Sequence, residues 1–357
     1  MLDEPMPAVS YVMPVLNEAE YIRDAVNGVL SQRYEGPKQV VLALGPSDDG
    51  TTGIVRQLAL NDPRITWVDN PAGRTPVGLN LAIRASDSPV IIRVDAHSIL
   101  DPDYTSRGVE TLFRTGAADV GGRMDAKGRN SLQRAAAAAY NSRFGLGGAA
   151  YHSGAPEGPA ESAYLGIFRR DVFDQVGFYD ETLWRGQDWE LCLRIRKSGA
   201  QVWFDPQLAV TYYPRDHFRR LSAQSYAAGV WRGELARRYP EGKSLRHLAP
   251  PVATSTIALG VASWLIPGDK FSGLGWLALR LVNATPVAYA VLVGIVALRS
   301  DLQTPKERVL LGAVLPTIHF PWALGFLKGR LQGAAGTTDQ SRLARSPSTR
   351  DRGAENA

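Results

Sequence analysis

The sequence contains a single cysteine, Cys192, so it cannot form an internal disulfide or a cysteine-based zinc site. Leucine and isoleucine surround Cys192 in the chain, which indicates a small buried apolar residue. No signal peptide is expected either, because the short acidic stretch 1–7 leads directly into an apolar segment. These absences fit a reducing compartment and exclude a disulfide-rich fold.

A Gly-x-Gly-x-x-Gly turn is also missing after the first apolar segment, which argues against a dinucleotide-dependent oxidoreductase. Instead, strand-like and helix-like patterns alternate, which predicts an α/β fold with parallel strands joined by right-handed crossovers. The predicted strands cover 9–15, 39–44, 65–69 and 90–94, and the predicted helices cover 22–30, 54–60 and 76–83. Thr75 is expected to cap the last helix, with Pro76 at its first position.

The predicted strand Val90–Val94 carries the strongest functional signal. It is apolar enough to lie buried on both faces of a sheet, and Asp95 and His97 follow it. Ligands of such sheets bind at the carboxyl ends of the strands. Because residues i and i+2 of an extended segment point to the same side, Asp95 and His97 could bind one divalent cation. The alternative is an ordinary turn after the strand.

The last third of the chain contains three apolar runs, which cover 252–266, 275–298 and 309–327. Only the second contains a charge, Arg280. A membrane crossing needs about 20 apolar residues, with about 17 as the lower end, so the first run is short and the others qualify. A domain of buried helices is the alternative, but three consecutive runs favour a transmembrane region over residues 251–330.

A basic segment, residues 214–250, precedes these runs. Between Pro214 and His247 it carries eight Lys and Arg against three acids, with apolar residues at helical spacing. This pattern is typical of an amphipathic helix on an anionic membrane surface, and the adjoining apolar runs favour that role over nucleic-acid binding. The positive-inside rule then puts the segment in the cytoplasm. Residues 331–357 are polar and are expected to be disordered.

Short motifs run in a fixed order through the expected catalytic domain, residues 1–213. They are Pro14-Val-Leu-Asn17-Glu18, Ser47-Asp-Asp49-Gly-Thr51, Asn70-Pro-Ala-Gly73-Arg74 with Asn80, Asp95-Ala-His97, Phe168-Arg-Arg-Asp171, Gly177-Phe-Tyr-Asp180-Glu181 and Gln187-Asp188-Trp-Glu190. Together they resemble the motifs of family-2 inverting glycosyltransferases with the GT-A fold, in particular membrane-associated members similar to succinoglycan-type glucosyltransferases. The resemblance implies a GT-A domain with a mostly parallel central sheet, followed by C-terminal transmembrane helices.

The resemblance also implies where a nucleotide-sugar donor would bind. Asn17 and Glu18 match the donor-binding loop after the first strand, and Asp49 belongs to the loop after the second. Arg74 resembles a basic residue near the donor diphosphate, although a solvated loop arginine is an equal alternative.

Asp95 and His97 stand where the family has an Asp-x-Asp motif that binds Mn²⁺ or Mg²⁺ through the diphosphate. Imidazole is softer than a carboxylate oxygen and therefore favours Mn²⁺. The family's uracil-binding acid is absent, since Leu44 or Gly45 occupies its position. A UDP-sugar is the expected donor, and a donor with another base stays open.

Asp188 aligns with the catalytic base of the family's Glu-Asp pair, in which Gln187 here replaces the Glu. Such a carboxylate would take the proton of the acceptor hydroxyl as it attacks the anomeric carbon. The competing interpretation makes Asp188 the N-cap of a helix that starts at Trp189. Trp184, Gln187 and Trp189 are candidates for the acceptor side, and core packing is an equal alternative for both tryptophans.

The expected function is transfer of a sugar to a lipid-linked or growing polysaccharide acceptor, in cell-envelope or exopolysaccharide synthesis. The enzyme would be a multi-pass protein of the inner membrane with a cytoplasmic catalytic domain and with membrane lipids, but no nucleic acid, among its partners. Synthesis of a polyprenyl-phosphate sugar and a non-catalytic membrane scaffold are the alternatives. Three crossings are expected, although a third run that lies flat or re-enters would keep the tail inside.

Overall fold

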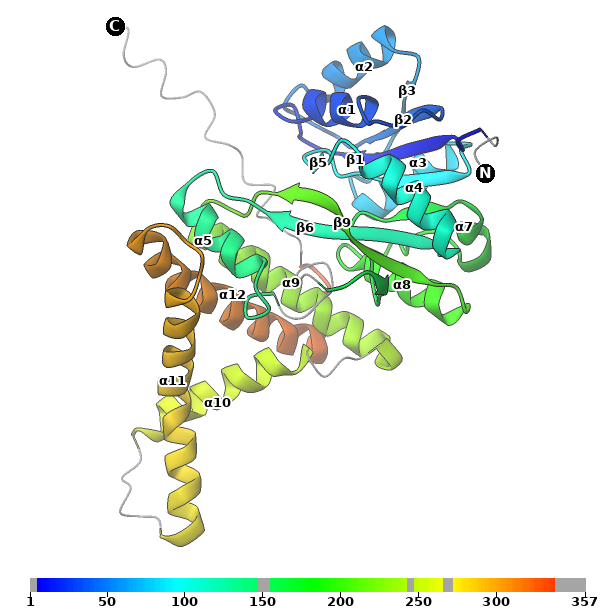
Figure 1. Cartoon of the computed structure of the whole chain (residues 1–357). Helices are drawn as coiled ribbons and strands as arrows, with labels where there is room; N and C mark the ends of the chain where they lie inside the picture. The colour runs from blue at the N-terminus through cyan, green and yellow to red at the C-terminus, as the bar shows by residue number, and fades with distance from the viewer. Residues whose placement is uncertain (1–4, 147–154, 243–246, 266–271, 338–357) are drawn as a thin grey trace, which may run out of the picture. The chain divides into compact units, whose positions relative to one another are not determined.

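A computed structural model describes residues 5–146, 155–242, 247–265 and 272–337 (Figure 1). The chain forms two compact units. The first takes in Met1–Lys127 and Tyr140–Tyr213, and the second takes in Gly128–Ala139 and Pro214–Ala357. The short stretch after Lys127 therefore belongs with the helices of the second unit. Most of the tail that was expected to be disordered, from residue 338 onward, lies outside the described residues.

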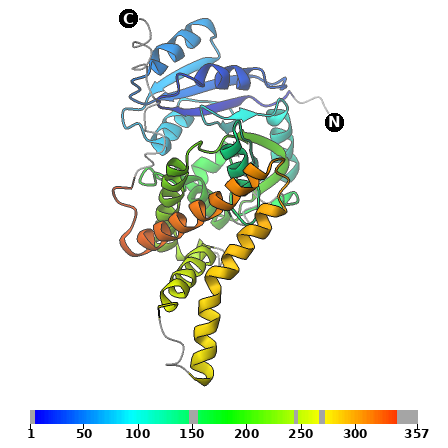
Figure 2. The same ribbon diagram turned by 90° about the vertical axis from the view of Figure 1, so that its left-hand side faces the viewer.

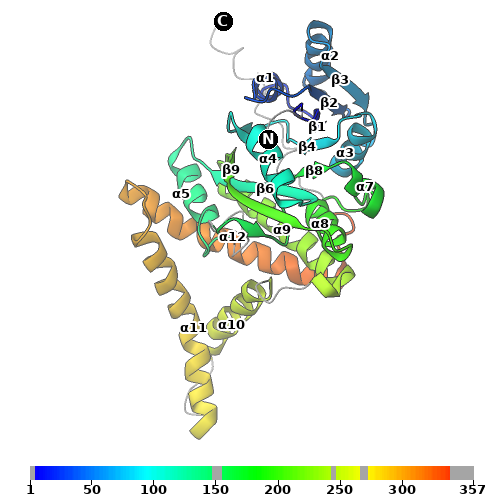
Figure 3. The ribbon, with the colours of Figure 1, turned by 45° about the vertical axis from the view of Figure 1, so that its right-hand side comes forward.

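The first unit is built on one mixed sheet. Within the described residues the strand order is β3-β2-β1-β4-β8-β6-β9-β5, and β7 pairs with β9. The strands are β1 (Val9–Val15), β2 (Lys38–Leu44), β3 (Ile65–Asp69), β4 (Val90–Arg93), β5 (Ile99–Leu100), β6 (Asp119–Ala126), β7 (Gly158–Pro159), β8 (Ile167–Arg169) and β9 (Val202–Tyr212). Strands β1 to β4 are parallel, β8 is antiparallel to β4 and β6, and β6 lies parallel beside β9 (Figure 3).

Helices cover both faces of this sheet, as its apolar strands require. The helices of the first unit are α1 (Ile22–Leu30), α2 (Thr51–Asn61), α3 (Thr75–Arg84), α4 (Tyr104–Thr115), α7 (Asp171–Val176) and α8 (Gln187–Lys197). In β4, Val90 and Ile92 pack in the apolar cluster that contains α1 and α4 residues, and Ile91 packs in the cluster that contains α3 and α8 residues. The predicted burial of this strand on both faces is confirmed.

The predicted strands and helices of the first hundred residues are present, with small shifts at their ends. Strand β4 ends at Arg93, and Asp95 and His97 lie in the turn that follows, where the N–H of Ser98 donates to the Asp95 carbonyl at 2.9 Å. The alternation of an extended strand therefore does not apply to this pair. Helix α3 begins at Thr75 with Arg74 as its N-cap residue, so the prediction that Thr75 is the cap is wrong.

Helix α8 begins at Gln187, two residues before the predicted start. Its N-cap residue is Gly186, whose φ of 77° lies in the left-handed region that glycine adopts without strain. Asp188 therefore lies inside the first turn, and no side-chain cap forms at this end of the helix. The interpretation of Asp188 as an N-cap is wrong.

The second unit is helical. Its helices are α5 (Ser131–Tyr140, the last residue belonging to the first unit), α9 (Phe218–Arg238), the 3₁₀ turn η1 (Pro240–Gly242), α10 (Ala249–Ser263), α11 (Gly273–Leu298) and α12 (Pro305–Gln332). Helices α9 and α12 run alongside each other (Figures 1 and 2).

Glycines make the close contact between α9 and α12. Gly229 and Gly233 lie on α9, and Gly325 and Gly329 lie on α12. A methyl group on any of the four would overlap a backbone carbonyl oxygen of the other helix. The four-residue spacing keeps each pair on one helix face, and small residues there allow two backbones to approach closely.

Among the described residues, two helices are long and apolar enough to cross a membrane, namely α11 and α12. Only 6% of the most apolar window of α11 is buried, against 39% for α12, which α9 covers. Helix α10 has 15 residues, about 22 Å at 1.5 Å per residue, and is shorter than the hydrocarbon core of about 30 Å. A crossing by α10 would therefore need local thinning of the bilayer, which hydrophobic mismatch induces at a modest cost.

Candidate functional site

Arg93 joins Asp95 to Asp188 at the carboxyl end of β4. Its guanidinium donates through Nη2 to Asp95 Oδ1 at 3.1 Å and through Nη1 to Asp188 Oδ1. The Arg93 side chain is 7% exposed, whereas those of Asp95 and Asp188 are 17% and 33% exposed. Burial disfavours the charge of Arg93, but Asp188 and Asp95 together keep its pKa well above the ordinary value. The cluster is thus a buried cation neutralised by two carboxylates nearer the surface.

A third carboxyl group, Asp119 at the start of β6, is fully buried. Burial raises the pKa of Asp119 to about 8; the Cys192 thiol and the charge of Arg93 lower it, and the charge of Asp188 raises it further. The thiol donates to Asp119 Oδ2 at 3.3 Å, and Cys192 is buried as predicted. Asp119 is therefore mostly protonated at neutral pH and adds little charge to the cluster.

His97 is paired with Glu18. The ring atom Nδ1 lies 2.9 Å from Glu18 Oε1, and both side chains are partly buried. When Nδ1 donates this bond, Nε2 carries the lone pair that a metal requires, and carboxylates commonly orient metal-binding histidines in this way. Glu18, expected at the donor, and His97, expected at the cation, are therefore in direct contact.

A cation would fit this site only with ligands from outside the protein. In the described parts of the chain, no three His, Cys, Asp or Glu side chains form a group that could hold a metal ion. Asp95 and His97 would supply two ligands, and bound phosphate oxygens and water would have to supply the others. This donor set of one carboxylate and one imidazole suits Mn²⁺ and tolerates Mg²⁺.

Asn17 fastens the loop after β1 to the loop after β2. Its side-chain oxygen accepts a hydrogen bond from the Asp48 N–H at 2.9 Å, and its own N–H donates to Ser47 Oγ at 3.0 Å. Asn17 has a φ of 55°, a left-handed conformation that asparagine tolerates better than most residues. Its side chain therefore shapes the predicted donor-binding loops.

Asp49 makes a second link between the same loops. It accepts hydrogen bonds from the N–H groups of Ala19 and Thr51, each at 3.0 Å. Burial raises the pKa of Asp49, but the Thr51 hydroxyl and these N–H groups more than offset it, so the pKa is lowered. Asp49 is thus an ionised structural anchor for the two loops.

Arg74 and Trp184 lie together. Arg74 Nη1 donates to the Glu181 carbonyl at 3.1 Å, and Arg74 Cζ lies 6.0 Å from the centroid of the Trp184 ring. Trp184 is 45% exposed, whereas Trp189 and Gln187 are each 6% exposed. Of the three acceptor-side candidates, only Trp184 presents a large surface to a ligand.

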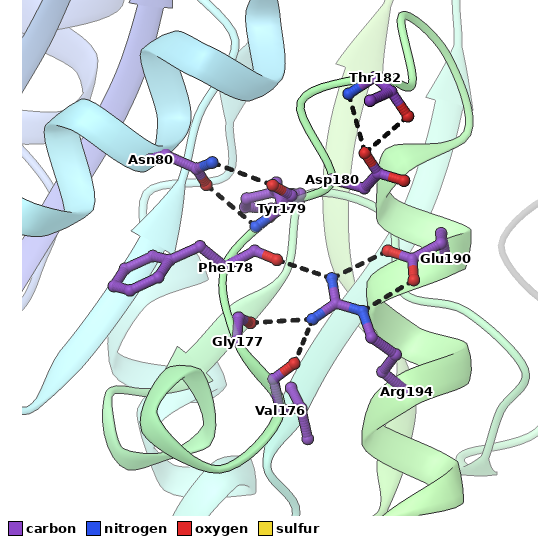
Figure 4. A network of polar contacts seen from close by, with 9 residues as sticks. All are labelled: Asn80, Val176, Gly177, Phe178, Tyr179, Asp180, Thr182, Glu190 and Arg194. Atoms are coloured by element: carbon purple, nitrogen blue, oxygen red, sulfur yellow. Dashed lines mark hydrogen bonds and ion pairs between the residues drawn. The ribbon is translucent and has the colours of Figure 1, made fainter.

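The segment between α7 and α8 is held by two polar side chains (Figure 4). Asn80 of α3 accepts from the Tyr179 N–H at 3.0 Å and donates to the Tyr179 carbonyl at 2.9 Å. Arg194 of α8 pairs with Glu190 at 2.7 Å and donates to the Phe178 carbonyl at 2.7 Å. These contacts fix the start of the loop that leads into α8 and its Asp188.

Sequence reasoning missed two residues of the cluster, Arg93 and Asp119. A signal existed for Arg93, because a lone arginine inside an apolar strand buried on both faces must find an acidic partner. Asp119 has no such signal. It is the first residue of β6, and the glycines and the arginine that follow make this strand too polar to be recognised as buried.

Comparison with known proteins gives consistent results. Residues 10–177 match the model of glycosyl transferase family 2. The succinoglycan biosynthesis protein ExoA of Rhizobium meliloti is 34% identical over 260 residues, which cover 71% of this chain and 78% of the relative. A dolichyl N-acetyl-alpha-D-glucosaminyl phosphate 3-beta-D-2,3-diacetamido-2,3-dideoxy-beta-D-glucuronosyltransferase of Methanococcus voltae is 23% identical over 243 residues, which cover 65% of this chain and 75% of the relative.

Solved structures are also similar to the chain over most of its length. The mannosyltransferase PcManGT from Pyrobaculum calidifontis, in complex with GDP-Man and Mn²⁺, aligns with a TM-score of 0.53 and 16% identity over 92% of this chain and 88% of that one. This likeness, with the mixed sheet described above, identifies the GT-A fold that the order of motifs predicted. The 34% identity to the Rhizobium meliloti relative, which extends over 78% of its length, establishes the family as well as the fold. The chain belongs to glycosyltransferase family 2 and is an enzyme of that family.

Proposed function

We propose that this glycosyltransferase inverts the configuration of the transferred sugar in a single displacement, with Asp188 as the general base. The observation that carries the proposal is the Arg93 bridge, which brings Asp188 of α8 next to Asp95 beyond β4. The Asp188 carboxylate is 33% exposed, so it can reach an acceptor hydroxyl. A general base must lie within hydrogen-bond reach of the proton that it removes.

The donor is proposed to be a nucleotide sugar bound over the carboxyl ends of β1, β2 and β4. Asp95 and His97 would hold Mn²⁺ or Mg²⁺, and a cation there supplies Lewis-acid stabilisation of the departing nucleoside diphosphate. The structural neighbour from Pyrobaculum calidifontis, a complex with GDP-Man and Mn²⁺, supports this class of donor and cation. A UDP-sugar is the first donor to test, and GDP-mannose the second, because no acid stands at Leu44 or Gly45.

The acceptor is proposed to be a lipid-linked or growing saccharide in the synthesis of an exopolysaccharide or another envelope glycan. The names of two relatives support this class, since one acts in succinoglycan biosynthesis and the other on a sugar carried by dolichyl phosphate. The exposed ring of Trp184 offers a surface on which a sugar could stack.

We further propose that α10 and α11 enter the membrane as a hairpin and that the α9–α12 pair lies on its cytoplasmic surface. Helix α9 carries five arginines, namely Arg219, Arg220, Arg232, Arg237 and Arg238. Because the glycine contacts hold α9 against α12, a crossing by α12 would take these charges toward the bilayer. An arginine at the bilayer centre costs about 2.5–3.5 kcal/mol. This arrangement takes the place of the third crossing that hydropathy predicts.

The test begins with donor binding. The full chain in detergent is heated with UDP-glucose, UDP-galactose, UDP-N-acetylglucosamine or GDP-mannose, each with Mn²⁺ and with EDTA. A donor that binds only the native state raises the midpoint of unfolding. We expect one nucleotide sugar to do so in Mn²⁺ and to lose its effect in EDTA.

Turnover is then measured as release of nucleoside diphosphate from that donor, with and without a membrane lipid extract as acceptor. Asp188→Asn should lower kcat about 10²- to 10⁴-fold and leave donor binding nearly intact, since the amide keeps the shape but cannot accept a proton. Asp174→Asn, on the exposed face of α7, is the matched control and should keep full turnover. Full turnover by Asp188→Asn would contradict the proposed base.

A further inference from the structure

We infer that Arg93 is a positioning residue that holds the carboxylate of Asp188 in the orientation in which it takes the acceptor proton, with Asp95 as the second anchor of the same guanidinium. The inference rests on the proposed role of Asp188. The two partners differ in how they are held: Arg93 belongs to a central strand, whereas Asp188 lies in the first turn of a helix whose N-cap, Gly186, has no side chain to hold that end.

The backbone around Arg93 is fixed from both sides. Arg93 is paired with Val12 of β1, and its N–H donates to the Gly166 carbonyl at 3.0 Å on the side of β8. By contrast, in the described structure the Asp188 carboxylate has Arg93 as its one side-chain hydrogen-bond donor, and it caps no backbone N–H of α8. The orientation of Asp188 therefore depends on the rigid arginine.

A guanidinium is required for this arrangement. Its planar donors can bind two carboxylates at once, whereas a lysine ammonium acts as a point charge. Arg93 uses one terminal nitrogen for each acid, and among the described residues its Nε has no hydrogen-bond partner. Asp119, buried nearby, is mostly protonated and does not compete for the charge. All side-chain hydrogen bonds of Arg93 in the described structure therefore go to Asp95 and Asp188.

A purely structural arginine would also neutralise two acids, so the test must separate positioning from stabilisation. It uses Arg93→Met, which removes the charge and keeps the length, in wild-type and Asp188→Asn backgrounds. The readouts are kcat and KM for release of nucleoside diphosphate from UDP-glucose with Mn²⁺, or from GDP-mannose with Mn²⁺ if the donor screen favours it. Midpoints of thermal unfolding are measured for every variant.

If Arg93 acts through Asp188, Arg93→Met lowers kcat about 10²-fold and changes KM less than about threefold. In the Asp188→Asn background the same change costs less than about threefold in kcat, because residues that act as a unit are not additive. Arg93→Lys, which reaches one acid at a time, falls between wild type and Arg93→Met. Arg170→Lys is the control: this arginine binds the carbonyls of Ser86 and Ser88, and its loss should leave kcat unchanged.

Equal losses of kcat in both backgrounds would overturn the inference, as would a change confined to KM. If Arg93→Met does not fold, the same cycle is run with Arg93→Lys, which keeps the buried charge. Failure of the proposed base looks different, because Asp188→Asn would then itself turn over at the wild-type rate.

Discussion

At the scale of single residues, the contact between His97 and Glu18 changes what a substitution at the cation site should do. Asp95→Ala should abolish metal-dependent donor binding. His97→Asp should keep activity and shift the preference from Mn²⁺ to Mg²⁺, because an all-oxygen site suits the harder ion. It would also set a carboxylate against Glu18, so we expect the variant to be less stable than wild type in EDTA and to gain more stability from Mg²⁺.

Calorimetry of UDP binding and thermal unfolding, each with Mn²⁺, Mg²⁺ or EDTA, measure these effects. His97→Asp combined with Glu18→Gln is the control, since it removes the repulsion and should restore stability in EDTA. Donor binding by the wild type that is unaffected by EDTA would contradict the cation site.

Asp119 makes a prediction about pH. Its pKa is about 8 in the folded protein and near the ordinary 3.8 in the unfolded chain, so between these values the folded state holds a proton that the unfolded state has lost. This group therefore lowers stability as pH rises from about 4 to about 8, by up to about 1.4 kcal/mol per pH unit, and has no further effect above that range. Asp119→Asn should unfold at a midpoint that falls less between pH 5 and pH 8 than that of the wild type.

Thermal unfolding at several pH values checks the prediction. Asp174→Asn, which removes an exposed carboxylate, should give a curve parallel to that of the wild type. A curve for Asp119→Asn that is also parallel would mean that Asp119 is ionised in the folded state.

At the scale of helices and strands, local sequence predicted the elements better than their partners. Val90–Val94 was recognisable as a strand because its residues are apolar, and the run of motifs identified the family. Helix α8 starts two residues earlier than the sequence predicts, because Gly186 serves as its N-cap through a left-handed φ that no local pattern shows. The Arg93–Asp188 pair joins residues 95 apart in sequence, so no local pattern could reveal it. The sequence shows the four-residue spacing of the glycines in α9 and in α12, but it does not show that the two glycine pairs face each other.

These glycines give a prediction at the same scale. Gly329→Ala should lower the midpoint of unfolding, since its methyl group would overlap the Val230 carbonyl and overpacking costs about 1–3 kcal/mol. Gly312→Ala in the same helix is the matched control, because its methyl group would meet nothing closer than 3.9 Å. Alanine there should be neutral or stabilise by up to about 1 kcal/mol. Equal midpoints for the two variants, measured in detergent, would contradict the close packing of α9 on α12.

At the scale of the whole molecule, the proposed hairpin predicts which side of the membrane each loop occupies. In a Cys192→Ser background, Ser272→Cys should react with a membrane-impermeant thiol reagent in intact cells. Ser300→Cys and Ser346→Cys should react only after lysis, because basic residues flank the first and the hairpin keeps the tail inside. Cys192→Ser alone is the unlabelled control.

Reaction of Ser346→Cys in intact cells would instead support a crossing by α12 and the three segments expected from hydropathy. Protection of Ser272→Cys until lysis would contradict the hairpin itself.

Helix α5 limits how such an enzyme can be divided or recombined. The chain passes between the two units three times, after Lys127, after Ala139 and after Tyr213. Within the helical unit, Arg134 of α5 donates to the buried Glu307 of α12 at 2.6 Å. A hybrid joined once, after Tyr213, would combine α5 of one protein with α12 of another. The residue at position 307 would then face an α5 without a matching arginine, and an unpaired buried charge is strongly destabilising. The helical unit is therefore not a separable appendage, and a working hybrid with a relative must inherit α5 together with the C-terminal helices.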